Sequence, residues 1–454
     1  MSLVSIDPAT GRVLQRYRPT PAAEIEATLA RAARAAARWR QEPVAARCAA
    51  MQALGTALRA RRDALAELIT AEMGKPLAQS LAEVEKCAAC CDYYARQGAA
   101  FLAPEIPPEA PAGAEVHFEP LGVVLAIMPW NFPLWQAFRA AIPALVAGNV
   151  LVLKHASNVS GCALAIAAVM RAAGLPRDLL QVLLVSGREA SGLIRDARIH
   201  GVTLTGSTEA GRTVAALAGA ALKPAVFELG GSDPYLIFED ADLDAAAECC
   251  AAARLVNNGQ SCVAAKRFIV ARRIQADFAK RLAERLNARR VGDPRAPDTD
   301  LGPLAREDLR RSLHRQVTAS VAGGARLLTG GVVPRGPGSF YPPTLLSQVP
   351  AGTPAFADEL FGPVAAVIPA RTEAEALRLA NATPFGLGAA VFTQDLDRAR
   401  RVAAALESGM VAINGSVRSE VSLPFGGVKE SGFGRELGLW GARSFVSVKT
   451  VRRF

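Results

Sequence analysis

The 454-residue sequence lacks the features that mark a membrane, secreted or nucleic-acid-binding protein. No run of about 18 apolar residues occurs, and the N-terminal MSLVSIDPATGRVL has no basic region ahead of an apolar core. We therefore expect a cytoplasmic protein with no membrane partner. Basic residues outnumber acidic ones by 52 to 42, but they are scattered among alanines without interleaved aromatics, so no nucleic-acid partner is expected.

Cysteine and histidine are also scarce. Eight cysteines in a chain of this length are too few for a disulfide framework and indicate reduced thiols. Cys87 and Cys90 form a CxxC, but no second pair of ligands follows at a zinc-like spacing, and the surrounding residues predict a buried helix. The four histidines form no cluster in the sequence. No metal site is expected.

The composition and the hydrophobic patterning predict a folded chain with more than one lobe. The chain is 51% hydrophobic and 21% charged, and its length exceeds what one hydrophobic core usually supports. Residues 21–100 have apolar positions at helical spacing, with breaks at Pro43 and at 74–76, and predict a run of long helices. Residues 103–120 are rich in Pro, Glu and Gly and then become strand-like, which predicts a projecting arm.

From residue 121 onward, short β-rich runs alternate with helical stretches, as in a doubly wound parallel sheet. A second series of the same kind begins after Gly231 and continues to about residue 415, which predicts a second α/β lobe. The segment 445–451 alternates like an isolated strand, and it could pair with the arm. The runs expected to be strands are LGVVLAI, LVLK, QVLLV, GVTLT, AVFEL, KRFIV, AAVIPA, GAAVFT and MVAI.

Cys262 is the candidate nucleophile. It lies in VNNGQSCVAAKR, where Asn and Gly residues precede the thiol, as expected for a loop that presents a reactive side chain. This segment and six others, in the same order and at compatible spacings, resemble the motifs of the aldehyde dehydrogenase superfamily. The other six are PWNFP at 129–133, LKHAS at 153–157, TGSTEAG at 205–211, FELGG at 227–231, DELFGP at 358–363 and PFGGVKESGFGRE at 424–436.

The resemblance implies the fold class and the domain organisation. It implies an α/β protein with two doubly wound lobes and a β oligomerisation arm, which would form a homodimer or a homotetramer. Residues 1–103 and 121–228 would form the dinucleotide-binding domain, and 229–419 the catalytic domain with the nucleophile. Residues 104–120 and 436–454 would form the arm and the tail.

The reaction of the family requires a nucleophile, a donor to the oxyanion and a base. The resemblance makes Cys262 the thiol that adds to the aldehyde carbon, and it makes the Asn131 side-chain amide and the Cys262 backbone N–H the oxyanion donors. Glu228, at the end of an apolar strand, would take the proton from the thiol or from the hydrolytic water. Because its neighbours are apolar, its pKa should be raised.

The cofactor is expected to be NAD or NADP. The G-x-G-x-x-G fingerprint is absent, but the resemblance places the pyrophosphate at Gly206 and Ser207, where a helix begins. Lys154 would reach the adenosine ribose. Ser157 stands where NAD-selective members often carry a glutamate, so we expect NADP to be accepted. The same crevice would be bordered by Pro129, Trp130, Leu229, Glu359 and Phe361.

Within the superfamily, the sequence resembles the shorter bacterial succinate-semialdehyde dehydrogenases. Arg139 and Ser419 lie where that subgroup contacts the acid group of its substrate, whereas Val256 replaces an arginine that the better-known members carry. A guanidinium in the aldehyde tunnel would need an anionic partner, which favours a carboxylate-bearing aldehyde. Glutarate semialdehyde, a general aliphatic aldehyde and a CoA-acylating reaction remain alternatives. No histidine stands in a motif near Cys262, which disfavours a cysteine hydrolase.

Overall fold

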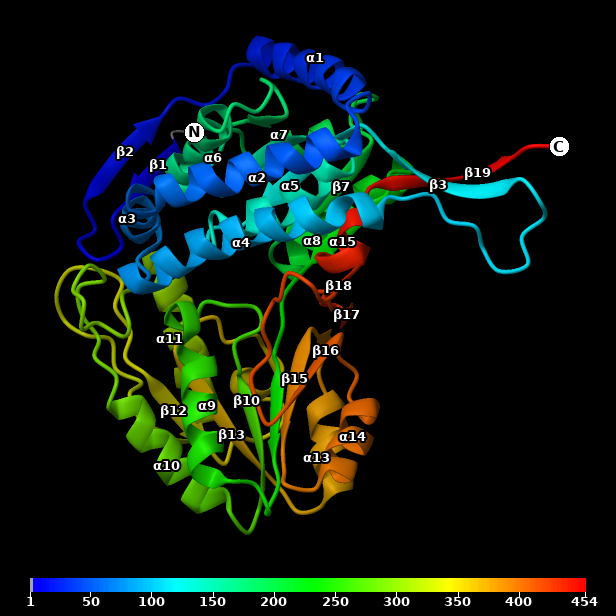
Figure 1. The fold of residues 1–454 in the computed structure, drawn as a ribbon. Coiled ribbons are helices and arrows are strands. Elements are labelled where there is room, and N and C mark those ends of the chain that lie inside the picture. The colour runs from blue at the N-terminus through cyan, green and yellow to red at the C-terminus, as the bar shows by residue number, and fades with distance from the viewer. Residues whose placement is uncertain (1–2) are drawn as a thin grey trace.

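Two α/β lobes and a projecting two-stranded arm make up the computed structural model, which describes residues 3–454 (Figure 1). The two doubly wound lobes expected from the sequence are present. Within the described residues no helix is both long and apolar enough to cross a membrane.

The first lobe begins with a short hairpin and four helices. The breaks predicted at Pro43 and at 74–76 are confirmed, and Gly74 ends a helix in the left-handed conformation, with φ 83°, that glycine adopts readily. A further break at Arg61 has no Pro or Gly and was not predicted, nor was the hairpin. These elements are β1 (Leu3–Ile6), β2 (Val13–Tyr17), α1 (Ala22–Trp39), α2 (Val44–Ala60), α3 (Arg62–Met73) and α4 (Leu77–Phe101).

The sheet of the first lobe has the order β18-β8-β7-β4-β5-β6, and only β18 is antiparallel to its neighbour. Its strands consist mostly of buried apolar residues because helices cover both faces. The elements are β4 (Val123–Met128), α5 (Trp135–Val146), β5 (Val150–His155), η1 (Ser157–Val159), α6 (Ser160–Ala172), β6 (Leu180–Val182), α7 (Gly187–Leu193), β7 (Gly201–Thr205), α8 (Thr208–Ala220), β8 (Ala225–Glu228) and β18 (Gly432–Phe433).

The second lobe is built on a seven-stranded sheet of order β11-β12-β13-β10-β9-β15-β16. Alternate residues of β9 enter different cores: Tyr235 and Ile237 pack with α9 and α10, whereas Leu236 and Phe238 pack with α11, α13 and α14. The sheet is therefore buried on both faces (Figure 1).

The bounds of the elements in this lobe are β9 (Pro234–Ile237), α9 (Leu243–Leu255), η2 (Val256–Gly259), β10 (Arg267–Ala271), α10 (Gln275–Asn287), α11 (Glu307–Ala322), β11 (Arg326–Thr329), β12 (Thr344–Ser347), α12 (Pro354–Ala357), β13 (Val364–Ala370), α13 (Glu373–Asn381), β15 (Gly388–Phe392), α14 (Leu396–Ala405) and β16 (Met410–Ile413). The short strands β14 (Phe385–Gly386) and β17 (Val428–Lys429) pair with each other outside the large sheet.

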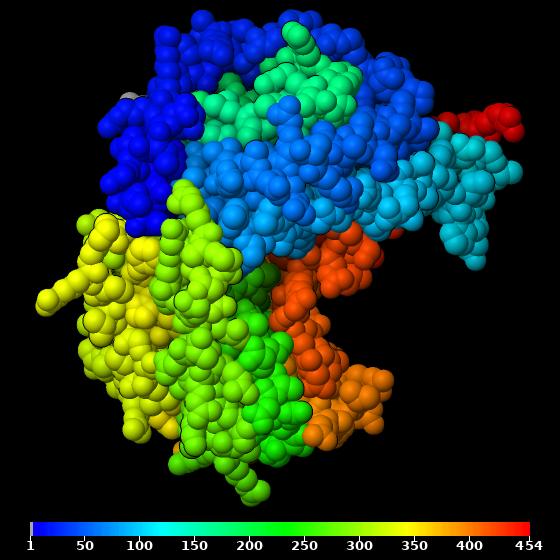
Figure 2. Space-filling view, turned by 60° about the vertical axis from the view of Figure 1, so that its left-hand side comes forward, coloured from blue at the N-terminus to red at the C-terminus, as the bar shows by residue number. Residues whose placement is uncertain are grey.

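The arm consists of β3 (Ala114–Pro120) and β19 (Val446–Arg452), which pair antiparallel and project from the body of the molecule (Figures 1 and 2). The suggested pairing of the tail with the arm is therefore present. Residues 436–445, which we had grouped with the arm and the tail, lie against the first lobe. Glu436 and Leu437 are buried, and α15 (Gly438–Arg443) packs on α4 and α5, with the Tyr94 hydroxyl donating to the Gly438 carbonyl.

The parallel strands of the first sheet end together, and this edge positions much of the predicted site. Met128 pairs with His155, and Thr205 pairs with Glu228. The segments that follow these four strand ends contain Asn131, Ser157, Gly206 and Glu228 itself. Ligands of open α/β sheets bind at this edge.

Candidate active site

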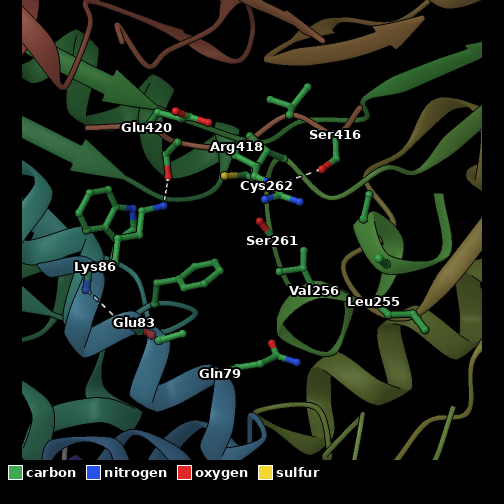
Figure 3. Close-up of a pocket in the computed structure, with 18 of the residues that line it drawn as sticks. Gln79, Glu83, Lys86, Leu255, Val256, Ser261, Cys262, Ser416, Arg418 and Glu420 are labelled. Atoms are coloured by element: carbon green, nitrogen blue, oxygen red, sulfur yellow. Dashed lines mark hydrogen bonds between the residues drawn. The ribbon is translucent and has the colours of Figure 1, made fainter. Parts of the chain in front are cut away.

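Cys262 lines a cavity of about 760 Å³ between the lobes. Helices α4 and α5 of the first lobe form one wall, and the loops around Cys262 and residues 416–422 of the second lobe form the other. Figure 3 shows Lys86 on the α4 side, with Cys262 and Val256 across the cavity.

The Asn and Gly residues before Cys262 hold the loop in one conformation. Asn257, Asn258 and Gly259 all have left-handed backbones, with φ of 57°, 56° and 74°. The Asn258 side chain donates to the carbonyls of Gly74 and Pro303 and accepts from the Gly302 N–H. A side chain at residue 259 would collide with the backbone of Gly362. These residue types hold a strained turn that presents the thiol rigidly.

Lys266 fixes the other end of this loop. Its buried ammonium donates to the carbonyls of Ser261, Cys262 and Ala264 at 3.1, 2.8 and 3.2 Å. The apolar surroundings raise the pKa of the Cys262 thiol to about 12, and the charges of Arg139 and Lys266 oppose this shift. The resting thiol is therefore protonated and needs a base. Lys266 was not among the predicted site residues, because only the fold shows that its side chain turns back onto the loop.

Asn131 lies beside the nucleophile loop, as the oxyanion role requires. Its side-chain amide donates to the Gln260 carbonyl at 3.1 Å, and its own carbonyl accepts from the Asn257 amide at 2.7 Å. An amide nitrogen carries two hydrogens, so one remains for a ligand. Across residues 3–454, the backbone N–H of Cys262 donates to no protein acceptor.

Glu228 is buried at the end of β8, and neither of its carboxylate oxygens accepts a hydrogen bond from the described residues. Burial raises its pKa well above the ordinary value, and the neighbouring Glu436 carboxylate adds to the increase, while Arg139 opposes it. The raised pKa expected from the sequence is therefore present. A carboxylate with free oxygens and a raised pKa can act as a general base near neutral pH.

Arg139 lines the cavity but already has an anionic partner within the protein. Its guanidinium forms a buried ion pair with Glu436, donates to the Thr205 hydroxyl at 3.3 Å and lies 4.5 Å from the centre of the Phe425 ring. Glu436 already provides the anionic partner, so this guanidinium does not by itself require a substrate carboxylate. The pair was not foreseen because its partners lie about 300 residues apart.

Ser419 lines the same cavity, as predicted, and sequence reasoning missed its partner. The Lys86 ammonium donates to the Ser419 hydroxyl oxygen at 2.6 Å and lies 4.4 Å from the centre of the Trp135 ring. Lys86 and Trp135 also line the cavity, and so does Val256. Sequence reasoning missed Lys86 because it lies within the long helix α4 and in no recognisable motif.

The cofactor residues Lys154 and Ser157 lie at the end of β5 and the start of η1. Burial lowers the pKa of Lys154, and in the part of the chain from Leu3 onward its ammonium has neither an ion pair nor a hydrogen bond. Ser157 is exposed three residues further on. An unpaired ammonium, with a neutral hydroxyl three residues further along the chain, fits an anionic ligand such as a 2′-phosphate.

Gly206 and Ser207 precede helix α8 as predicted. The Gly206 N–H donates to the Glu228 carbonyl, and the Ser207 hydroxyl oxygen accepts from the Ala210 N–H at 3.3 Å as a helix cap. Leu229 packs against Gly211 of the same helix, where a side chain would have no room. This end of α8 offers backbone N–H groups at the positive end of a helix dipole, which suits a pyrophosphate.

Glu359 and Phe361 face the first lobe from the second. The Glu359 carboxylate accepts from the Gly231 N–H at 3.1 Å, and Phe361 packs edge-on against Trp130, which follows Pro129, with ring centres 5.7 Å apart. Together with the unpaired Lys154 and the free end of α8, these residues fit a nicotinamide dinucleotide. The arrangement as a whole places a thiol, a base and amide donors at the ends of the first sheet and on the loop that faces it, as oxidation through a thioester requires.

Comparisons with known proteins agree with this chemistry. Residues 2–451 match the model of the aldehyde dehydrogenase family. A probable NADP-dependent succinate-semialdehyde dehydrogenase of Synechocystis is 46% identical, with 99% of each chain covered. An NAD(P)-dependent succinate-semialdehyde dehydrogenase of Escherichia coli is 47% identical, over 99% of this chain and 97% of the relative. The crystal structure of succinic semialdehyde dehydrogenase from Streptococcus pyogenes with NADP⁺ matches with a TM-score of 0.97, 36% identity and 99% coverage of both chains.

Proposed function

The chain belongs to the aldehyde dehydrogenase family, and we propose that it oxidises succinate semialdehyde to succinate with NADP as the preferred cofactor. The observation that supports this substrate most directly is that the nucleophile Cys262 opens into a cavity in which Lys86, on the opposite wall, donates to the Ser419 hydroxyl oxygen. The relatives named above act on the same aldehyde.

The first half of the reaction forms a bond between sulfur and carbon. Glu228 takes the thiol proton of Cys262, directly or through a water molecule, and the sulfur adds to the aldehyde carbon. The Asn131 amide and the Cys262 backbone N–H donate to the oxyanion that forms. A bound NADP would supply the acceptor for the hydride of this carbon, and loss of the hydride would leave a thioester on Cys262. Removal of one such oxyanion donor typically costs about 10²–10³ in rate.

The second half of the reaction releases the acid. Glu228 first releases the thiol proton to solvent and then takes a proton from water, the water oxygen attacks the thioester carbon, and the carbon–sulfur bond breaks. The leaving thiolate takes the proton of the new carboxylic acid, so the products are the carboxylate and the regenerated Cys262 thiol, and Glu228 releases its second proton to solvent. Both oxygens of Glu228 are free of partners in the described residues, which supports hydrolysis over transfer of the acyl group to CoA.

The cofactor residues act by binding and orientation. Lys154 and Ser157 would hold the adenosine ribose and its 2′-phosphate, and Gly206, Ser207 and Leu229 would border the pyrophosphate. Glu359, Phe361, Trp130 and Pro129 would place the nicotinamide ribose and ring next to Cys262. The unpaired ammonium of Lys154 supports NADP over NAD.

Initial rates of NADPH formation test the proposal with succinate semialdehyde, glutarate semialdehyde and butanal, each with NADP, with NAD and with added CoA. We expect kcat/KM for succinate semialdehyde to exceed that for butanal by about 10²–10⁴. A neutral aldehyde leaves the charged and polar donors that would bind the carboxylate without a partner. Equal values for these two aldehydes would contradict the substrate, and a rate that requires CoA would contradict the hydrolytic step.

We further propose that the chain works as a homodimer or homotetramer in the cytoplasm. The β3–β19 arm exposes the apolar side chains of Val448 and Val451, which another copy of the chain could cover. The strand β16 lies at the edge of the second sheet, where a strand of another copy could pair with it. The eight cysteines are all free thiols, as a reducing compartment would keep them. Light scattering of the full chain, and of a variant lacking residues 446–454, tests the assembly.

A further inference from the structure

Four basic side chains line the cavity, and they differ in what they already contact. Arg139 is buried and ion-paired with Glu436, and Arg289 is ion-paired with Glu248. Arg418 is exposed at the mouth, where it donates to the Ser416 hydroxyl at 3.2 Å. Lys86 is half-buried, and across residues 3–454 no carboxylate lies within ion-pair distance of it.

The one acid close to Lys86 on its own helix is already engaged. Glu83, three residues earlier, pairs with Lys75 at 2.5 Å and accepts from the backbone N–H groups of Leu134 and Trp135. Lys86 therefore faces the cavity with a positive charge that the protein does not neutralise. Burial, and then the charge of Arg139, lower the pKa of Lys86 to about 8. A bound anion would stabilise the charged ammonium and raise this pKa again.

Two further donors stand beside this ammonium. Because Lys86 donates to the Ser419 oxygen, the Ser419 hydroxyl keeps its own hydrogen for a ligand. The Trp135 indole N–H is buried and has no acceptor among residues 3–454. An ammonium, a hydroxyl and an indole N–H together match the acceptors of a carboxylate.

Resting on the proposed function, we infer that Lys86, with Ser419 and Trp135, binds the distal carboxylate of the substrate and sets the preference for an acidic aldehyde. The charge that Val256 does not supply on the second-lobe wall is thus provided from helix α4, on the opposite wall (Figure 3). Arg139, paired with Glu436, is a neighbouring charge in the same cavity.

Steady-state kinetics of Lys86→Met and Lys86→Arg test this assignment with succinate semialdehyde and butanal. In Lys86→Met we expect the ratio of kcat/KM for the two aldehydes to fall about 10²-fold, mainly through KM for succinate semialdehyde. Lys86→Arg should recover most of the ratio, because it restores a charged donor. Lys280→Met removes an exposed lysine of α10 outside the cavity and should leave the ratio as in wild type.

The two proposals fail in different ways. If wild type prefers succinate semialdehyde and Lys86→Met keeps that preference, the inference about Lys86 is wrong and the proposed function stands. If wild type oxidises both aldehydes equally well, the proposed substrate is wrong, and so is the inferred role of Lys86. Should Lys86→Met not fold, as judged by its thermal melt, Lys86→Gln provides the same comparison with a polar side chain.

Discussion

The Glu228 carboxylate lies directly against the backbone of Gly426. A side chain at residue 426 would begin 2.7 Å from the Glu228 Oε1 atom, and the backbone there has φ of 152°, which L residues rarely adopt. The PFGG segment therefore has a specific function: its first glycine leaves the space in which the base sits.

Gly426→Ala should displace Glu228 and slow the release of the acid. We expect kcat to fall about 10²-fold, since misplacement of a reacting group by about 1 Å can cost that much. Rapid-quench measurement of the first turnover checks this, because formation of the thioester and its hydrolysis can be followed separately. Gly192→Ala, at a glycine with open space around it, is the matched control and should turn over normally. Wild-type kcat in Gly426→Ala would refute the steric role.

Much of this arrangement was accessible from the sequence, and what was missed has a common cause. The run GVTLT at 201–205, expected to be a strand, coincides with β7, because local periodicity decides such elements. Cys262, Asn131 and Glu228 lie in short motifs and were found there. The Arg139–Glu436 pair and the Lys86–Ser419 contact join residues about 300 positions apart, and no local pattern encodes them.

The charge of Glu436 should contribute to the pH at which Glu228 becomes active. Burial, and then the negative charge of Glu436, raise the pKa of Glu228, so the deprotonated base is lost as pH falls through this raised value. Glu436→Gln removes the charge and frees Arg139 from its ion pair, and both effects lower the pKa of Glu228. We therefore expect the acidic limb of the kcat profile to move to lower pH.

The pH dependence of kcat in wild type and Glu436→Gln measures this shift. Glu430→Gln removes a more exposed carboxylate that pairs with Arg212 and provides the control, with no expected movement of the limb. A limb that moves to higher pH in Glu436→Gln would show that Glu436 does not act on the base as its position indicates.

Ser157 should control the choice between the two cofactors. Ser157→Glu places a carboxylate near the 2′-phosphate and beside Lys154, and we expect kcat/KM with NADP to fall about 10²-fold or more while NAD remains usable. Ser157→Ala adds no charge and should keep the NADP preference. The ratio of kcat/KM for the two cofactors, measured at a saturating aldehyde concentration, provides the test. An unchanged ratio in Ser157→Glu would place the determinant elsewhere.

The central claim is that an acidic aldehyde is oxidised through a thioester on Cys262. Trapping that thioester while two aldehydes compete for the enzyme tests it most directly. The thioester forms in the first turnover, before water attacks it. Wild-type enzyme is mixed with NADP and equal concentrations of succinate semialdehyde and butanal, quenched in acid within that first turnover and digested with trypsin. The mass of the peptide from Leu255 to Lys266 then reports which acyl group Cys262 carries. We predict mainly the succinyl group, and none in the Cys262→Ala variant; a butyryl group in equal or greater amount, or a wild-type peptide without any acyl group, would contradict the account.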